Sequence, residues 1–192
     1  MKTFQRLGLS KHTLTLAGDY LYLYGGSLRY GHFSNQMYRI RTQALSEWER
    51  IISKKMGDLH ITAHSMVYYE EINVLMLFGG IRRDVARFSQ LSGLMYQFNL
   101  DSFTWAQMKL AQRHKHPSGQ DYVPPERAFH SAHIMGNYMV VFGGYSHKHN
   151  EVENCYDQNL YFFHLGCHTW VSAFSVSQGL QIIRNDNRIH LL

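Results

Sequence analysis

The sequence predicts an all-β fold made of three similar four-stranded units. Three observations carry this prediction: one pattern of residues occurs three times, the apolar segments are short, and helical periodicity is weak throughout. These segments are rich in tyrosine, valine, leucine and phenylalanine, and such residues fit a pleated, half-buried strand. The 192 residues and the 45% hydrophobic content suit a single folded domain rather than a disordered chain.

Each unit carries four marks in the same order. A histidine precedes the first strand, a double glycine ends the second strand, and a tyrosine and a tryptophan follow. The histidines lie 13, 15 and 13 residues before the first glycine of each pair. Besides His12 and His64, the residues that we assign to this structural pattern are Gly25, Gly26, Tyr38, Trp48, Gly79, Gly80, Tyr96, Trp105, Arg127, His130, Gly143, Gly144, Tyr161 and Trp170.

A double glycine after an apolar strand, followed by tyrosine and tryptophan at a period of about 50 residues, resembles the kelch blade. Kelch blades close into β-propellers, which typically have about four to eight blades. The resemblance covers residues 6–174 and predicts blades over 1–53, 54–110 and 111–174, with a tail of unassigned role over 175–192. We therefore expect a partial kelch β-propeller whose ring is not closed. A β-sandwich with glycine-rich turns is the structural alternative.

The third unit is similar to the kelch region of the attractin and multiple-EGF-like-domains family over residues 126–172. The similarity rests on the run Met-Val-Val-Phe-Gly-Gly over 139–144, the His- and Asn-containing loop after it, and the spacing of Cys155, Cys167 and Trp170. This resemblance implies a large single-span cell-surface parent with an extracellular propeller and EGF-like modules. It further implies a non-catalytic role in signalling, a protein partner, and remaining blades in the parent chain, with no direct membrane contact by this segment.

The two cysteines are candidates for a disulfide. An extended strand between Cys155 and Cys167 would separate their Cα atoms by more than the ~7 Å that a disulfide spans. Either the leading loop folds back, or each cysteine pairs elsewhere or stays free, and buried packing is the plain alternative.

The sequence gives no support for catalysis, cofactors, metals or nucleic acid. It has no nucleophile elbow, phosphate loop or dinucleotide fingerprint, and the net charge of +5 comes without a long basic run. The pairs His114/His116 and His147/His149 flank lysines, whereas zinc needs three or four convergent ligands. We expect the histidines that open the blades to be structural hydrogen-bonding groups. No signal peptide or span precedes the blades, so a cytoplasmic location is the alternative.

The long connections are predicted to share one edge of the blades, because in a four-stranded meander alternate connections emerge on the same side. They are 27–36, 81–93, 145–158 and the linker 106–127, and they carry nine basic and six acidic residues. Long loops on a rigid scaffold often carry recognition, so we expect a protein partner with an acidic patch. The candidate binding residues are Arg29, Arg82, Arg83, Arg87, Arg113, His147 and Lys148. The alternatives are ordinary solvated loops, an intracellular kelch adaptor that recruits substrates to a ubiquitin ligase, and a kelch-fold enzyme.

Overall fold

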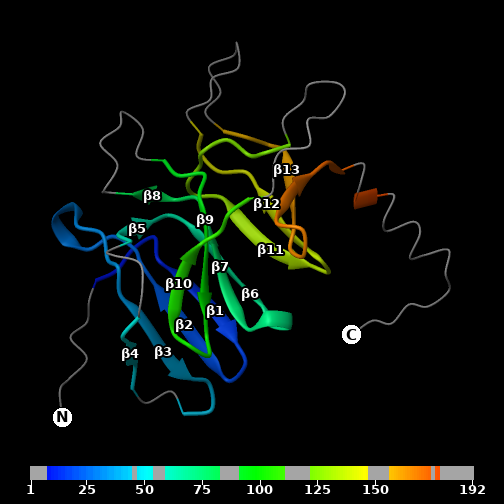
Figure 1. The fold of residues 1–192 in the computed structure, drawn as a ribbon. Coiled ribbons are helices and arrows are strands. Elements are labelled where there is room, and N and C mark those ends of the chain that lie inside the picture. Colours follow the sequence, from blue (N-terminus) through cyan, green and yellow to red (C-terminus); the bar gives the residue numbers. More distant parts are fainter. Residues whose placement is uncertain are drawn as a thin grey trace.

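The structure is all-β, as the sequence predicts. It is a computed structural model that describes residues 8–44, 47–53, 59–82, 91–110, 122–146, 156–173 and 176–177. Three four-stranded antiparallel sheets follow one another along the chain (Figure 1). A pair of two-residue strands forms a separate small sheet between them.

The three sheets repeat one meander, in which each strand pairs with the strand that follows it within the same sheet. The first sheet contains β1 (Thr13–Ala17), β2 (Tyr20–Tyr24), β3 (Met37–Arg41) and β4 (Glu49–Ile51). The second contains β6 (Ser65–Tyr69), β7 (Val74–Phe78), β9 (Met95–Asn99) and β10 (Thr104–Gln107). The third contains β11 (Ser131–Met135), β12 (Tyr138–Phe142), β13 (Leu160–His164) and β14 (Thr169–Val171). The small sheet pairs β5 (Ile61–Thr62) with β8 (Ile81–Arg82), and the short 3-10 helices are η1 (Arg29–Gly31) and η2 (Glu70–Ile72).

The first strands of the sheets line up next to one another. Strand β6 contacts β1 on one side and β11 on the other, while the fourth strands lie at the far ends of the sheets. This is the arrangement of successive blades around an axis, so the structure is a partial β-propeller whose sheets do not close a ring. We keep the bounds 1–53, 54–110 and 111–174 as our proposal for where each blade begins and ends.

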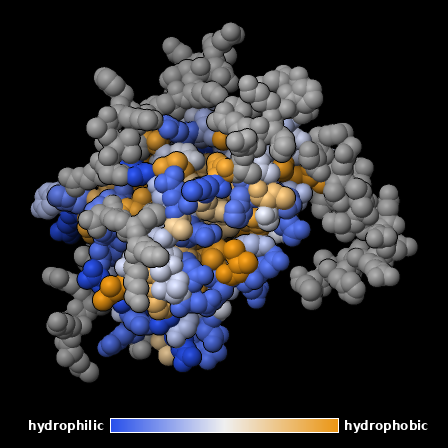
Figure 2. Space-filling model, viewed as in Figure 1, coloured by the Kyte–Doolittle hydropathy of each residue, from blue (hydrophilic) through white to orange (hydrophobic). Residues whose placement is uncertain are grey.

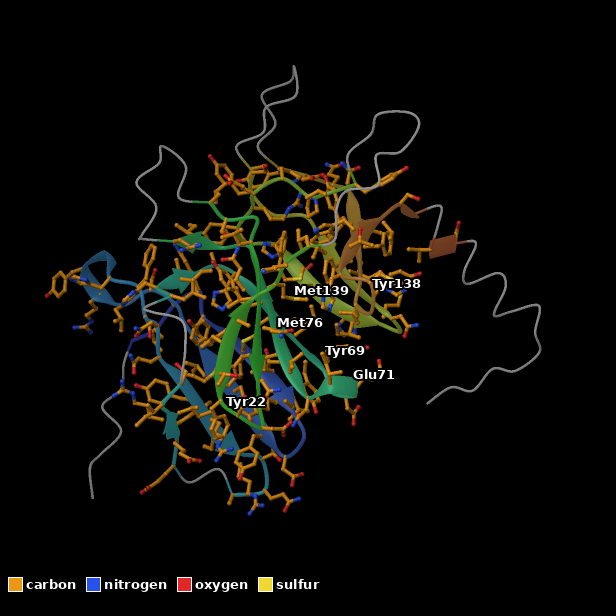
Figure 3. The ribbon with its side chains drawn as sticks, viewed as in Figure 1. Tyr22, Tyr69, Glu71, Met76, Tyr138 and Met139 are labelled. Carbon is orange, nitrogen blue, oxygen red and sulfur yellow. The ribbon has the colours of Figure 1, made fainter. Side chains whose placement is uncertain are left out.

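Strand β7 explains why its sequence is an unbroken apolar run. All five residues from Val74 to Phe78 are buried, because the second sheet is covered on both faces. Successive strand residues point to opposite faces, so Leu75 and Leu77 join the core against the first sheet. The alternate residues of β7, including Met76, join the core against the third sheet. Figure 3 shows Met76 close to Met139 of β12 in this second core.

We use the word joint for the contact between two successive sheets. At each joint, the aromatic residue before the double glycine packs against the next sheet's tryptophan. The ring centroids of Tyr24 and Trp105 are 4.7 Å apart, and those of Phe78 and Trp170 are 5.3 Å apart. Both tryptophans are buried, whereas Trp48 of the first sheet is half-buried.

The opening histidine of each following sheet completes the joint. His64 Nε2 lies 2.9 Å from Thr13 Oγ1, and His130 Nε2 lies 2.8 Å from Ser65 Oγ. Each bond connects a histidine to the first strand of the preceding sheet. These two histidines are buried structural groups, as the sequence led us to expect.

In the first two glycine pairs, the first glycine makes room for the histidine ring of the next sheet. A Cβ added at Gly25 would lie 2.8 Å from His64 Cε1, and one added at Gly79 would lie 2.6 Å from His130 Cε1. Such distances are far inside van der Waals contact, so only glycine fits against the ring. The histidine and the double glycine of the sequence pattern are therefore the residues that allow two successive sheets to pack closely.

Burial keeps the joint histidines neutral. It lowers the pKa of His64 to about 3, with a further lowering from the charges of His130 and His12. It also lowers the pKa of His130 to about 4, helped by the nearby Arg127 and partly offset by a bond with the Phe78 backbone. Protonating either ring would place a charge in the apolar contact between two sheets.

We predict that acid weakens the fold well above the pH at which carboxylates titrate. The pKa of each histidine is lower in the folded chain than the ~6.5 of an unfolded chain, so the unfolded state binds more protons and stability falls as the pH drops below about 6.5. At about pH 5 the loss should be about 2 kcal/mol for each joint histidine. Urea unfolding at neutral pH and at about pH 5 measures it.

Single substitutions assign this effect to the joints. The variants His64→Asn and His130→Asn should each remove part of the pH dependence, whereas His133→Asn, at an exposed position, should leave it unchanged. A free energy of unfolding that is the same at both pH values would contradict the assignment, as would a pH dependence that survives both joint substitutions.

Candidate functional site

The described parts of the long connections lie at one edge of the sheets, which we call the long-loop edge. Gly26 N–H donates to the Ile61 carbonyl at 2.9 Å, and Gly80 N–H donates to the Arg127 carbonyl at 2.8 Å. The connection after β2 and the connection after β7 are thus each bonded to the linker that leads into the next sheet. The β5–β8 pair extends this contact (Figure 1). The opposite edge has short turns, where Thr42 N–H donates to the Asp19 carbonyl.

Two of the candidate binding residues fall within the part of the chain that the structure describes. Arg29 is exposed in η1, on the connection between β2 and β3. Arg82 is half-buried in β8, where its Nη1 donates to the Tyr96 hydroxyl at 2.7 Å. Arg82 therefore also holds its connection against β9. The remaining candidates, Arg83, Arg87, Arg113, His147 and Lys148, lie outside the described residues.

An aromatic side chain that the sequence did not single out stands beside Arg29. Tyr30 is 95% exposed and has a φ of 64°, an uncommon conformation for a residue with a side chain. A bond from Leu28 N–H to the His32 carbonyl, 2.7 Å long, closes the turn around it. The signal in the sequence was an aromatic next to an arginine, inside a loop that the following Gly31 makes tight.

Further along this edge, Tyr156 is a second exposed aromatic residue, at 69% exposure. Its ring lies edge-on to that of Tyr145, with centroids 6.1 Å apart. Exposed tyrosines next to arginines are typical of the residues that dominate protein interfaces. These two exposed tyrosines, with Arg29 beside Tyr30, make the described part of the long-loop edge the candidate binding surface.

One of the basic residues at this edge is an internal structural group. Arg127 is fully buried and forms an ion pair of 2.8 Å with Asp157, whose Oδ2 also accepts a 2.6 Å hydrogen bond from the Tyr161 hydroxyl. Its Nη1 donates to the Gly143 carbonyl at 2.7 Å, and its guanidinium lies 4.5 Å from the centre of the Tyr161 ring. This network holds the base of the connection between β12 and β13.

Burial would raise the pKa of Asp157, but hydrogen bonds from Tyr161 and Asn159 and the charge of Arg127 outweigh it and lower the pKa. Burial and the adjacent carboxylate raise the pKa of Tyr161. The pair Arg127 and Asp157 is thus charged and internally compensated. The excess of basic over acidic residues in the long connections is therefore the same with or without this pair.

The first two sheets replace this ion pair with uncharged residues at the same positions. Ser34 and Ser92 stand where Asp157 does, since all three donate their N–H to the second glycine of their own sheet. Both serines are buried, and each accepts a bond of 3.1 Å from the N–H two residues later. Ile61 and Leu9 take the position of Arg127. An arginine there without the aspartate would be a buried charge without a partner, which explains why the arginine and aspartate occur together.

Several further expectations concern absences or residues that lie partly outside the described ranges. Cys167 is exposed and makes no disulfide within the described part of the chain, and Cys155 lies outside it. Among those residues no group of three or more His, Cys, Asp or Glu side chains is arranged to hold a metal ion. None of the described helical segments has the length and apolar character that crossing a bilayer requires.

The successive open sheets and their joints define a β-propeller segment. Residues 2–189 match the Attractin/LZTR1 beta-propeller family, and the chain belongs to that family. It is 38% identical over 171 residues to multiple epidermal growth factor-like domains protein 8 of Homo sapiens and of Rattus norvegicus, a match that covers 86% of this chain. The resemblance indicated by the third unit is thereby confirmed.

The chain spans only 6% of the length of these two relatives. It is also 30% identical over 136 residues to dynein regulatory complex subunit 7 of Chlamydomonas reinhardtii, a match that covers 70% of this chain and 10% of that protein. The matched segment is therefore a small part of each of these relatives.

We predict that Asp157→Asn destabilises the fold much more than a matched change at an exposed ion pair. The asparagine keeps the shape but leaves Arg127 buried without a counter-charge, which should cost about 3–5 kcal/mol. Glu49→Gln breaks the 2.8 Å ion pair between Glu49 and Arg39, whose side chains are 61% and 20% exposed, respectively. Its loss should lower the free energy of unfolding by about 0–1 kcal/mol. Urea unfolding of both variants makes the comparison. Equal losses would contradict the structural role of the buried pair.

Proposed function

We propose that this chain is a non-catalytic protein-interaction module in the extracellular part of a cell-surface signalling protein. The observation that carries the proposal is the exposed pair Arg29 and Tyr30 on the long-loop edge. Membership of the attractin-type propeller family supports it, and so does the similarity to proteins whose name describes multiple epidermal growth factor-like domains. We further propose that a longer parent chain supplies the remaining blades.

The partner is a protein with an acidic patch. The long-loop edge has more basic than acidic residues, and a planar guanidinium makes two parallel bonds to a carboxylate. Tyr30 adds a large apolar surface that needs little ordering on binding, because its turn is already closed. Arg29 and Tyr30 are therefore our leading anchors. Arg82, Arg83 and Arg87 remain candidates, and Arg82 has the additional task of holding Tyr96.

A second candidate function is an intracellular assembly module. The similarity to a protein named as a subunit of a dynein regulatory complex favours it. An adaptor that brings substrates to a ubiquitin ligase belongs to the same class. In either case the binding surface would be the long-loop edge, so the two candidates differ in compartment and partner rather than in the residues used.

We predict that the double change Arg29→Glu and Tyr30→Ala weakens partner binding without changing the fold. The probe is the chain, multimerised and applied to an array of purified extracellular domains of cell-surface proteins. Binding to a cognate domain should weaken at least about tenfold in the variant, because both a charge contact and an aromatic anchor are lost. It should also weaken as salt is raised, since exposed charges are screened.

The control changes the opposite edge. Glu70→Lys with Glu71→Lys alters two exposed residues of η2 among the short turns and should leave binding unchanged. If no extracellular domain binds while cytosolic proteins arrayed in the same way do, the intracellular function replaces the first one. If the control abolishes binding and the Arg29/Tyr30 variant does not, the site lies on the short-turn edge instead.

A further inference from the structure

The third sheet ends in one half of a joint. Phe142 stands where Tyr24 and Phe78 stand in the other sheets, but it is 48% exposed whereas they are 1% exposed. Among the residues that the structure describes, a Cβ added at Gly143 would meet only the Asp157 carbonyl oxygen, at 3.7 Å, and no histidine ring. We call this the outgoing half. Its other described members are Ser131, at the position of Thr13 and Ser65, the Phe129 carbonyl and the Gly144 N–H.

The first sheet begins with the other half, which we call the incoming half. His12 is exposed, and its Cβ lies against Gly26 just as the His64 Cβ lies against Gly80. Leu14 and Leu16 are 54% and 57% exposed. Their counterparts in the second sheet, Met66 and Tyr68, pack into the core of the first joint. In the first sheet, Arg39 of β3 pairs with Glu49 of β4, so Trp48 comes next in the register. Trp105 and Trp170 occupy the same register position in the second and third sheets.

The two halves fit one another group by group. The joints inside the chain predict contact of the His12 ring with Gly143 and Phe142, and a hydrogen bond between His12 and Ser131. Backbone groups complement each other as well. Ala63 N–H donates to the Lys11 carbonyl, and Phe129 N–H donates to the Ala63 carbonyl, both at 2.9 Å. By the same pattern, the Phe129 carbonyl would accept a hydrogen bond from the corresponding N–H of a following sheet. In another copy of the chain, Lys11 supplies that N–H.

We propose that, where no further blades compete for these halves, two copies of this chain close head to tail into a six-bladed ring with two-fold symmetry. Each copy contributes three sheets, one outgoing half and one incoming half. Two copies therefore pair every half, and six blades fall within the range of about four to eight that propellers use. One copy has too few blades to close, and three copies would give too many.

The apolar residues of the two halves give the association its driving force. In the first sheet these are Leu14 and Leu16, and in the third sheet they are Phe142, Leu160 and Met135, all more than 40% exposed. Figure 2 shows apolar residues as separate patches on a mostly hydrophilic surface, as viewed from one side. Contact within the ring would cover these side chains as the inner joints cover Tyr24 and Phe78. This inference does not use the long-loop edge. It concerns the 192-residue chain without the further blades that the proposed function assigns to a longer parent.

The experiment is the mass of the 192-residue chain in solution, measured by light scattering after size exclusion at micromolar concentration. The expected mass is twice the 22.5 kDa of one copy. Leu14→Lys with Leu16→Lys disables the incoming half, and Phe142→Lys disables the outgoing half, because each puts a charge into an apolar joint. Each variant alone should be a single copy with an unchanged circular dichroism spectrum, whereas a mixture of the two keeps one intact joint and should pair at lower affinity.

Further variants keep the result interpretable. His12→Ala retains the Cβ that touches Gly26 but removes the ring, and should weaken pairing at least about tenfold, as the loss of a buried aromatic contact does. The control Ile72→Lys changes an equally exposed apolar residue, 50% exposed on the short-turn edge, and should still form pairs. Arg29→Glu with Tyr30→Ala should also still form pairs, which separates this inference from the proposed function.

Three results would overturn the inference. The first is a wild-type chain that stays a single copy at high concentration. The second is a mass that keeps growing beyond two copies, since an open chain of copies would mean that the ring does not close. The third is a pair that survives in the Leu14→Lys, Leu16→Lys variant, since the contact would then lie elsewhere.

Discussion

The contact between a glycine and the ring of a buried, neutral histidine organises this protein. Each sheet of four short strands has two faces, and neither is stable unless another sheet covers it. The glycine that ends the second strand lets His64 or His130 come within touching distance of the preceding sheet, and the ring then bonds to Thr13 or Ser65. Around this contact the aromatic residues of both sheets close, and the strand β7 becomes buried on both sides. Stability, pH response and the chemistry of the exposed ends all follow from it.

The same contact determines what the edge of the molecule can do. Because Gly26 and Gly80, the second glycines of the first two pairs, bond to the linker of the next sheet, the first two long connections start from a fixed base. The buried pair Arg127 and Asp157 adds a second anchor in the third sheet, where the serines Ser34 and Ser92 serve in the others. Under the proposed function, Arg29 and Tyr30 would therefore stand on a connection whose base is hydrogen-bonded to the next linker.

Sequence alone was enough for the sheets, because their signals are local: the apolar runs, the turns and the double glycines each act over a few residues. It was also enough to mark His64 and His130 as structural. It could not show which residues they bind, since Thr13 lies 51 positions before His64 and Ser65 lies 65 positions before His130. Sequence reasoning missed Tyr30 because its exposure depends on a closed turn with positive φ. It also missed the hydrogen bond between Arg82 and Tyr96, because no residue spacing in the sequence indicates it. The ion pair of Arg127 was hidden for the same reason, with Asp157 at the far end of a connection.

The most direct test of the glycine–histidine contact compares the stabilities of Gly79→Ala and Gly18→Ala by urea unfolding. Both glycines have positive φ, +68° and +53°, so both changes carry a similar backbone strain. At Gly79 the new methyl would lie 2.6 Å from His130 Cε1 and 2.7 Å from the Arg127 carbonyl oxygen, both across the joint, whereas Gly18 has nothing within 4 Å. Overpacking of this kind costs about 1–3 kcal/mol, so Gly79→Ala should be less stable than Gly18→Ala by that amount. Equal losses of stability in the two variants would contradict the claim that the glycine–histidine contact holds the sheets together.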